Sequence, residues 1–214
     1  EIWYVTCTVP NMLINFISKT KTISFSGCIT QFYFFFSLGT TECFLLCVMA
    51  YDRYLAICRP LHYSSLMTGQ LCAILVSLCW LIGFLAHSIP IFFIYQLPFC
   101  GPNIIDHFLC DMDPLMALSC APTPIIKHVL HSVSSFIIIF SMLYTLGSYF
   151  LVLRAVLQIS SSAGQQKAFS TCGSHLVVVS LFYGTIMVMY VSPTSRNSVS
   201  MHKVITLMYS VVTP

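Results

Sequence analysis

The sequence predicts an all-α membrane protein. The chain has 214 residues, of which 57% are hydrophobic and only 7% are charged, whereas a soluble globular domain usually carries about 25% charged residues. Its mean hydropathy is +0.88, and several apolar stretches reach the about 20 residues that a helix needs to cross a bilayer. The formal net charge of +3 comes without a basic run, so no nucleic-acid partner is expected. The expected surroundings of the chain are membrane lipid.

The first half of the chain holds the tail of one helix and two complete spans. The opening segment is mostly apolar but is interrupted at Pro10. A short polar connection separates it from a long span with one ionisable residue expected inside the membrane, Glu42. A loop broken by Pro60 leads to the next span, which has Trp80 near its middle. The expected helical segments cover residues 1–17, 26–54 and 71–93.

The second half holds a long loop, two further spans and the start of another helix. The loop has 33 residues, among them three Cys, three Asp and five Pro. The two spans flank a polar connection that is rich in Ser and Gln. The chain opens at Glu1 without a Met and stops inside an apolar run, so we expect a fragment of a longer protein. The segments are the loop 94–126, the span 128–153, the connection 154–166, the span 167–191, the loop 192–203 and the partial helix 204–214.

Four cysteines are expected at one face of the membrane. Cys28 begins the first complete span, and the loop at 94–126 contributes the other three. Cys28 and Arg53 are 25 residues apart, which places them about 37 Å apart at opposite membrane faces. Disulfides persist outside the cytosol, and if the loop is extracellular, Arg53 is cytoplasmic. The Arg53 side carries four Lys and Arg residues and the other side five, so the distribution of basic residues does not indicate the orientation. Spacing leaves all three pairings open, and free thiols are the alternative.

Two sequence blocks resemble a known receptor family. The block MAYDRYLAICRPLHY at 49–63 is similar to the end of the third transmembrane helix and the next loop of olfactory receptors, which are rhodopsin-like G-protein-coupled receptors. The block KAFSTCGSHLVVVSLFYGTIMVMYV at 167–191 resembles their sixth helix, with Tyr183 where other rhodopsin-like receptors usually carry Trp. Leu55 is a small departure, because Val is commoner there. EIWYVTCTVPNML at the start and LMYSVVTP at the end also fit, so the resemblance covers essentially the whole chain.

The resemblance implies an incomplete seven-transmembrane-helix receptor bundle. The four full and two partial spans match helices three to six, the end of helix two and the start of helix seven. Residues 1–214 would form a single receptor domain in the plasma membrane. The loop at 94–126 would be extracellular, and both the loop at 154–166 and the Arg53 end would be cytoplasmic. In this family the middle loop Cys is bonded to the third helix and the outer two pair together, which implies Cys28–Cys110 and Cys100–Cys120.

Helical spacing predicts a ligand pocket between the spans. On the span 26–54, two Phe and one Thr recur every four residues and share one face, about 6 to 18 Å below Cys28 by helical rise. On the span 167–191, a second set follows at i, i+4 and i+7. An apolar, aromatic pocket with a few hydroxyls suits a small volatile molecule, and the alternative is that these stripes only pack helices together. The predicted ligand-binding residues are Phe32, Phe36, Thr40, Ile137, Tyr183, Met187 and Tyr190.

The resemblance implies a function in odorant detection. A small volatile odorant would shift the receptor toward a state that opens a cleft for a heterotrimeric G protein of the olfactory stimulatory type. A transporter or channel is the alternative, but the spans lack matching pairs of Gly/Pro-broken half-helices. The sequence contains no HExxH, GxSxG or paired membrane Asp, so we expect neither an enzyme nor a cofactor. The predicted coupling residues are Asp52, Arg53, Tyr54, Tyr149, Arg154 and Lys167.

The sequence evidence for ion sites is weaker than that for the ligand pocket. The resemblance implies that Glu42 helps to hold a sodium ion with an acidic residue of helix two, and a protonated, hydrogen-bonded Glu42 is the alternative. His128 and His131 are spaced like metal ligands on a helix, but no third ligand type lies nearby, so no metal site is predicted. His107-x-x-Cys110 is weaker still, because the same Cys is better used in a disulfide. The roles of His87 and His175 stay open.

Overall fold

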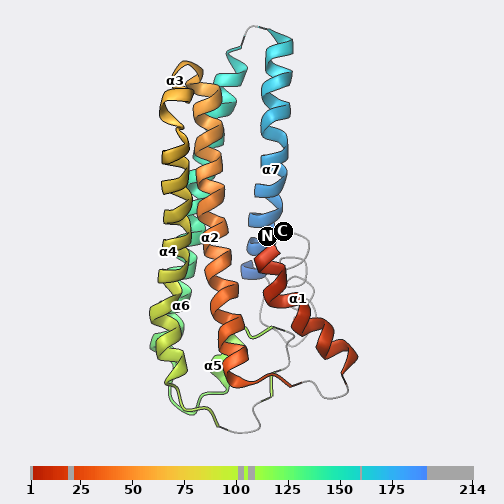
Figure 1. Cartoon of the computed structure of the whole chain (residues 1–214), viewed down its shortest axis with the longest axis vertical. Helices are drawn as coiled ribbons and strands as arrows, with labels where there is room; N and C mark the ends of the chain where they lie inside the picture. Colours follow the sequence, from red (N-terminus) through yellow and green to blue (C-terminus); the bar gives the residue numbers. More distant parts are fainter. Residues whose placement is uncertain (1, 19–21, 101–103, 106–108, 160, 192–214) are drawn as a thin grey trace.

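The computed structural model describes residues 2–18, 22–100, 104–105, 109–159 and 161–191 (Figure 1). Four of its helices are long and apolar enough to cross a membrane, which confirms the predicted all-α membrane class. The loop expected at 192–203 and the partial helix expected at 204–214 lie outside the described residues. The helices are α1 (Ile2–Ile17), α2 (Phe25–Cys58), α3 (Pro60–Leu66), α4 (Gly69–Tyr95), α5 (Met112–Ala117), α6 (Pro124–Leu157) and α7 (Ser162–Val191).

The long helices extend beyond the apolar runs from which they were predicted. Polar N-caps explain part of this extension, since a capping side chain satisfies backbone N–H groups of the first turn. The Ser24 side chain accepts a hydrogen bond from the backbone N–H of Gly27 at 3.1 Å, and Thr68 accepts one from Leu71 at 3.3 Å. The expected interruption at Pro10 is absent, because α1 continues through this residue.

Three connections differ from the prediction. The loop at 55–69 contains α3, and the loop at 94–126 contains α5. The connection expected at 154–166 is shorter, because α6 continues to Leu157 and α7 begins at Ser162. Polar residues extend the start of α7: the Ser161 hydroxyl accepts from the backbone N–H of Gly164 at 3.0 Å, and the Gln165 amide donates to the carbonyl of Ile159 at 3.0 Å. A polar sequence therefore continues the helix past the apolar segment.

The central helix of the bundle is α2. It packs against α4 and α6 over much of its length, and also against α1, α3 and α7. Figure 1 shows α2, α4 and α6 running side by side, with α1 inclined to them. Helix α4 approaches α2 closely at Gly83, where an added Cβ would overlap Thr41 Oγ1 and lie 2.9 Å from the Ser37 carbonyl oxygen. Nearby, the Tyr33 hydroxyl donates to the Phe84 carbonyl at 3.3 Å.

Replacing Gly83 by Ala should lower the thermal stability of the full-length receptor, because the new methyl group has no room between α2 and α4. Overpacking of this kind costs about 1–3 kcal/mol. The unfolding midpoint of purified receptor in detergent measures the effect. Gly147→Ala on α6 is the matched control, since nothing lies within 4 Å of its added Cβ and the change improves helix propensity by about 0.5–1 kcal/mol. Equal midpoints for the two variants would contradict the close packing at Gly83.

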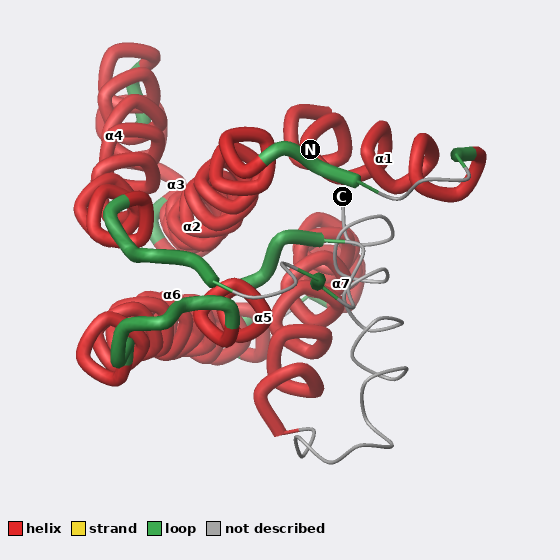
Figure 2. The backbone as a smooth tube through the Cα atoms, turned by 90° about the horizontal axis from the view of Figure 1, so that it is seen from below, coloured by secondary structure: helices red, strands yellow, loops and turns green. Residues whose placement is uncertain are grey.

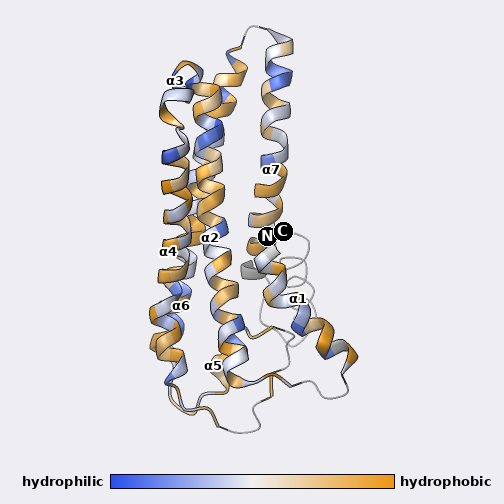
Figure 3. Ribbon diagram, viewed as in Figure 1, coloured by the Kyte–Doolittle hydropathy of each residue, from blue (hydrophilic) through white to orange (hydrophobic). Residues whose placement is uncertain are grey.

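Of the four buried clusters to which α2 contributes, one joins Phe35 and Leu38 to Leu109, and the other three follow one another along the helix. The first contains Cys28 and Phe32, the second Cys43 and Leu46, and the third Ala50. The outer faces of α4 and α6 are largely apolar (Figure 3), as expected for helices that face lipid. We name the two ends of the bundle by their landmarks: the disulfide end, at Cys28, and the Arg53 end, beside α3.

Candidate functional site

The long loop is fixed to the bundle at the disulfide end. Disulfides join Cys28 to Cys110, with Cα atoms 5.4 Å apart, and Cys100 to Cys120, with Cα atoms 5.7 Å apart. Figure 2 looks along the bundle from this end and shows α5 beside the ends of α2 and α6. Three apolar residues of α5 pack into the first cluster with Phe32, which is 1% exposed. These residues are Met112, Leu115 and Met116.

Charged side chains flank the loop on its outer side. The carboxylate of Asp113 on α5 accepts from the ammonium of Lys127 on α6 at 2.6 Å, and the His131 ring lies 4.0 Å from the same carboxylate. Asp111 caps α5 by accepting from the backbone N–H of Met112 at 2.6 Å. Among the residues described, no group of three His, Cys, Asp or Glu side chains is arranged to hold a metal ion. The surroundings of His131 are therefore those of an ion pair.

The predicted pocket residues occupy two levels of the bundle. Phe32 and Phe36 are in contact, with ring centroids 4.5 Å apart, and both belong to the first cluster beneath the loop. Ile137 and Tyr183 lie in the second cluster, which joins α2, α6 and α7. Thr40 is buried on α2, between the residues that α2 contributes to these clusters. The structure thus brings together Phe32 with Phe36, and Ile137 with Tyr183.

The inward face of α7 differs from the predicted one. Its residues in the second cluster follow the spacing i, i+3, i+4 and i+7, and they are Val179, Phe182, Tyr183 and Ile186. At about 100° per residue, Met187 is rotated by roughly a quarter turn from the centre of this face. Met187 is accordingly 45% exposed and is not part of the second cluster. The side chain of Tyr190 lies outside the described residues.

Buried polar atoms surround the second cluster. The Tyr183 side chain is 6% exposed, and its hydroxyl is buried without a hydrogen-bond partner among the described atoms. The hydroxyl groups of Ser141 and Thr145 lie close enough to interact with it, and the Cys43 thiol is also nearby. Both hydroxyl residues are fully buried on α6. The thiol of Cys47 donates to the Ser141 carbonyl at 3.6 Å. Uncharged hydrogen-bonding groups from α2 and α6 therefore lie around the Tyr183 phenol of α7.

Sequence reasoning missed Ser141 and Thr145, although a signal for them was present. From Ile137, steps of four residues along α6 reach Ser141, Thr145 and Tyr149, and all four are buried. Residues at this spacing share one helix face. Since Ile137 and Tyr149 were both predicted to serve a function, the two hydroxyl residues between them could have been included in the candidate site.

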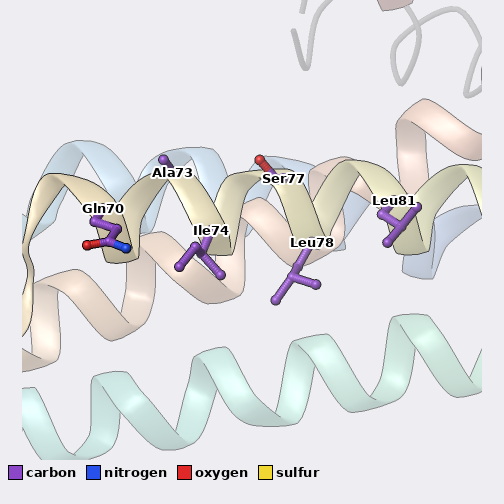
Figure 4. Close-up of a pocket in the computed structure, with 6 residues that line it drawn as sticks. All are labelled: Gln70, Ala73, Ile74, Ser77, Leu78 and Leu81. Atoms are coloured by element: carbon purple, nitrogen blue, oxygen red, sulfur yellow. The ribbon is translucent and has the colours of Figure 1, made fainter.

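A shallow groove on the outside of the bundle is separate from these clusters. Its volume is about 340 Å³, and Figure 4 shows that its lining side chains all project from α4. The lining residues are Gln70, Ala73, Ile74, Ser77, Leu78 and Leu81. None of the predicted ligand-binding residues is among them. The groove lies on the face of α4 that is exposed outside the bundle, so it is a feature of the lipid-facing surface.

The Arg53 end contains a hydrogen-bonded ion pair. Arg53 Nε lies 3.6 Å from Asp52 Oδ2, while the Tyr63 hydroxyl of α3 donates to Asp52 Oδ1 at 2.8 Å. This hydrogen bond to a carboxylate raises the pKa of Tyr63 above its usual value, because it favours the protonated phenol. Tyr54 is partly buried against the third cluster. Arg154 and Lys167 are exposed at the same end.

At this end α6 and α7 are linked by a buried polar contact. The Tyr149 hydroxyl is hydrogen-bonded to His175 Nδ1, and both residues lie within electrostatic range of Arg53. Tyr149 also packs with Ala50 of α2 and Cys172 of α7 in the third cluster. His175 Nε2 is buried without a hydrogen-bond partner among the described atoms. The predicted residues Arg53 and Tyr149 therefore lie where α2, α6 and α7 meet.

Comparisons with known proteins agree with this architecture. The family model described as "Olfactory receptor" matches residues 1–214. The chain belongs to the olfactory receptor family. Olfactory receptors are seven-helix G-protein-coupled receptors of the plasma membrane and are not enzymes, which confirms the predicted family and receptor class. A transporter or channel is not favoured.

Individual human relatives match this olfactory receptor chain along its whole length. It is 83% identical to Olfactory receptor 11H7 of Homo sapiens over 214 residues, covering 68% of that protein. It is 68% identical to Olfactory receptor 11H4, covering 66% of it, and 50% identical to Olfactory receptor 6N1, covering 69% of it, both also human. The chain thus spans about two thirds of the length of these relatives.

Proposed function

We propose that this olfactory receptor binds a small, mostly apolar volatile odorant and activates a heterotrimeric G protein of the olfactory stimulatory type. The ligand would lie between α2, α6 and α7, in contact with the predicted pocket residues of α2, with Ile137 of α6 and with Tyr183 of α7. The observation that carries this proposal is the buried hydroxyl of Tyr183, which has Ser141 and Thr145 as polar neighbours but makes no hydrogen bond of good geometry to either. A buried polar group without a partner is costly, and one polar atom of a bound odorant would complete its hydrogen bonding. The surrounding apolar side chains would hold the rest of the molecule by burial.

We further propose that the disulfide end is extracellular and the Arg53 end cytoplasmic. Two disulfides lie at the first end, and disulfides persist outside the cytosol. The G protein would then meet Arg53 together with Asp52, Tyr54 and the neighbouring cationic side chains of Arg154 and Lys167. A sodium-binding role for Glu42, which lies partly buried on α2, stays a prediction.

Activation would shift the population of two receptor states. The third cluster and the Tyr149–His175 hydrogen bond hold α6 and α7 against α2 near Arg53. An outward movement of α7 at the Arg53 end would open the cleft for the G protein. An odorant in contact with Tyr183 that binds this open state better than the closed state would favour it. A ligand can shift the equilibrium only by its difference in affinity for the two states. Odorant contacts with α7, the helix that moves, would therefore couple ligand binding to opening of the G-protein cleft.

Expression of the full-length receptor in cultured cells tests this function. Second-messenger levels are measured against a panel of odorants, with surface labelling of the receptor and with cells that lack it as controls. We expect a concentration-dependent rise in cyclic nucleotide for at least one small volatile compound. Receptor at the cell surface that raises no second messenger with any compound of a chemically broad panel would contradict the proposal.

Tyr183→Phe should weaken the response to odorants that carry an oxygen atom. The change keeps the ring and removes one hydroxyl, whose hydrogen bond is worth about 1 kcal/mol. Potency should fall about fivefold, while odorants of the same carbon skeleton without oxygen should be unaffected. Concentration–response curves at equal surface expression provide the measurement. Tyr95→Phe, at an exposed position on α4, is the matched control. If Tyr183→Phe leaves the potency of every agonist unchanged, the Tyr183 hydroxyl does not contact the ligand.

A further inference from the structure

Gln31 joins three parts of the molecule at the disulfide end. Its side chain is 7% exposed, and both ends of its amide are hydrogen-bonded. The amide nitrogen donates to the carbonyl of Cys7 on α1 at 3.1 Å. The amide oxygen accepts from the backbone N–H of Cys110 in the long loop at 3.1 Å. The loop, α1 and α2 therefore meet at one side chain.

Cys110 is consequently held to α2 by two different bonds. Its sulfur is bonded to Cys28, and its backbone N–H is bonded to Gln31, one helical turn further along α2. A disulfide bridge contains several rotatable bonds, so by itself it fixes the distance of Cys110 from α2 more firmly than the orientation of its backbone. The amide of Gln31 supplies the second fixed point.

The orientation of Cys110 determines what the adjacent loop residues cover. Leu109 is 1% exposed and packs with Phe35 and Leu38 of α2. On the other side of Cys110, Met112 packs with Phe32 in the first cluster. A rotation of the Cys110 backbone would move these two apolar side chains away from α2. Both Phe32 and its neighbour Phe36 are predicted ligand-binding residues, so the position of the loop sets the boundary of that region.

We propose that Gln31 is a positioning residue that holds the loop over the predicted odorant site, by a contact separate from the Cys28–Cys110 disulfide. The chemistry of the amide suits this role, because the site requires one donor and one acceptor on the same side chain. A Leu or Met would leave the buried N–H of Cys110 and the Cys7 carbonyl without this partner. An ionised Glu would place an acceptor against the Cys7 carbonyl. The effect on ligand response rests on the proposed function, whereas the effect on the loop does not.

Gln31→Met tests the proposal in the full-length receptor, because Met has similar length and no hydrogen-bonding amide. Hydrogen–deuterium exchange of peptides from the segment 109–117 is measured on purified receptor in lipid nanodiscs. We expect exchange at Cys110 to rise about tenfold, as for the loss of one buried hydrogen bond. Non-reducing peptide mapping should still find the Cys28–Cys110 disulfide. In cells, the agonist concentration for half-maximal response should rise by a similar factor, with the maximal response unchanged.

Two further variants complete the test. Gln96→Met, at an exposed position beyond α4 at the same end, should leave both exchange and potency unchanged. Gln31→Asn keeps the amide but is one methylene too short to reach both partners, so it should give an intermediate rise in exchange and serves if the Met variant does not fold. Wild-type exchange in the Asn or Met variant, or an equal rise with Gln96→Met, would overturn the proposal. If exchange rises in the Gln31 variants as expected but the wild-type receptor responds to no odorant, the proposed function fails and the role of Gln31 in the loop stands.

Discussion

Replacing Arg53 by Lys should remove most G-protein signalling while the receptor still reaches the cell surface and binds its ligand. The planar guanidinium offers several donors in a fixed geometry, which an ammonium group cannot reproduce. Losing hydrogen bonds to a charged group costs about 1.5–3 kcal/mol, so the response should fall roughly 10- to 100-fold. Surface labelling alongside a cyclic-nucleotide assay in the same cells measures both quantities.

The contrast with Arg59→Lys makes the Arg53 experiment specific. Arg59 is exposed between α2 and α3, only six positions further along the chain, and we expect its Lys variant to signal normally. If Arg53 only anchored the end of the helix at the lipid headgroups, Lys would replace it without loss, because a Lys side chain reaches the interface equally well. Normal signalling by the Arg53→Lys receptor would therefore show that the DRY motif only marks the point where the helix leaves the membrane.

Loss of the Cys28–Cys110 disulfide should have the second large effect. Removing a native disulfide typically costs about 2–5 kcal/mol, and here it would also free the loop that covers Phe32. Cys110→Ser should therefore show a much lower unfolding midpoint and little receptor at the cell surface. Cys72→Ser, which changes a free, partly buried Cys of α4, is the control and should resemble the wild type.

Peptide mapping of the full-length receptor under non-reducing conditions checks the pairing itself. We expect one linked pair of peptides for Cys28 and Cys110 and another for Cys100 and Cys120. Recovery of Cys110 as a free thiol would show that the assigned pairing is wrong.

The spans could be predicted from sequence because their signal is one of length. Stretches such as 71–93 are long enough to cross a bilayer and contain almost no charge. The direction in which a side chain points carries a weaker signal. Residues 176–191 of α7 are apolar on nearly every side, so periodicity does not separate an inner from an outer face. Met187 was assigned to the pocket by counting four residues from Tyr183, whereas the face that packs inward runs through Ile186.

Long-range hydrogen bonds could not be predicted for a different reason. Gln31 lies in a mostly apolar segment, and its two partners are 24 and 79 residues away in sequence. Local pattern shows that such a residue needs a partner, but it does not indicate which backbone group will be near. The pairing of Tyr149 with His175, from two different helices, depends in the same way on how α6 and α7 are packed together.

The uneven stiffness of the helices suggests which part of the receptor bends. No proline interrupts α2 over its 34 residues, and the helix packs against neighbours on several sides. It should therefore behave as a rigid helix about 50 Å long. By contrast, α7 packs against α2 and α6 much less extensively, and its Gly173 and Gly184 have open space where a side chain would be. Thermal motion should therefore be largest in α7, which can bend while α2 keeps the two ends of the receptor at a constant separation.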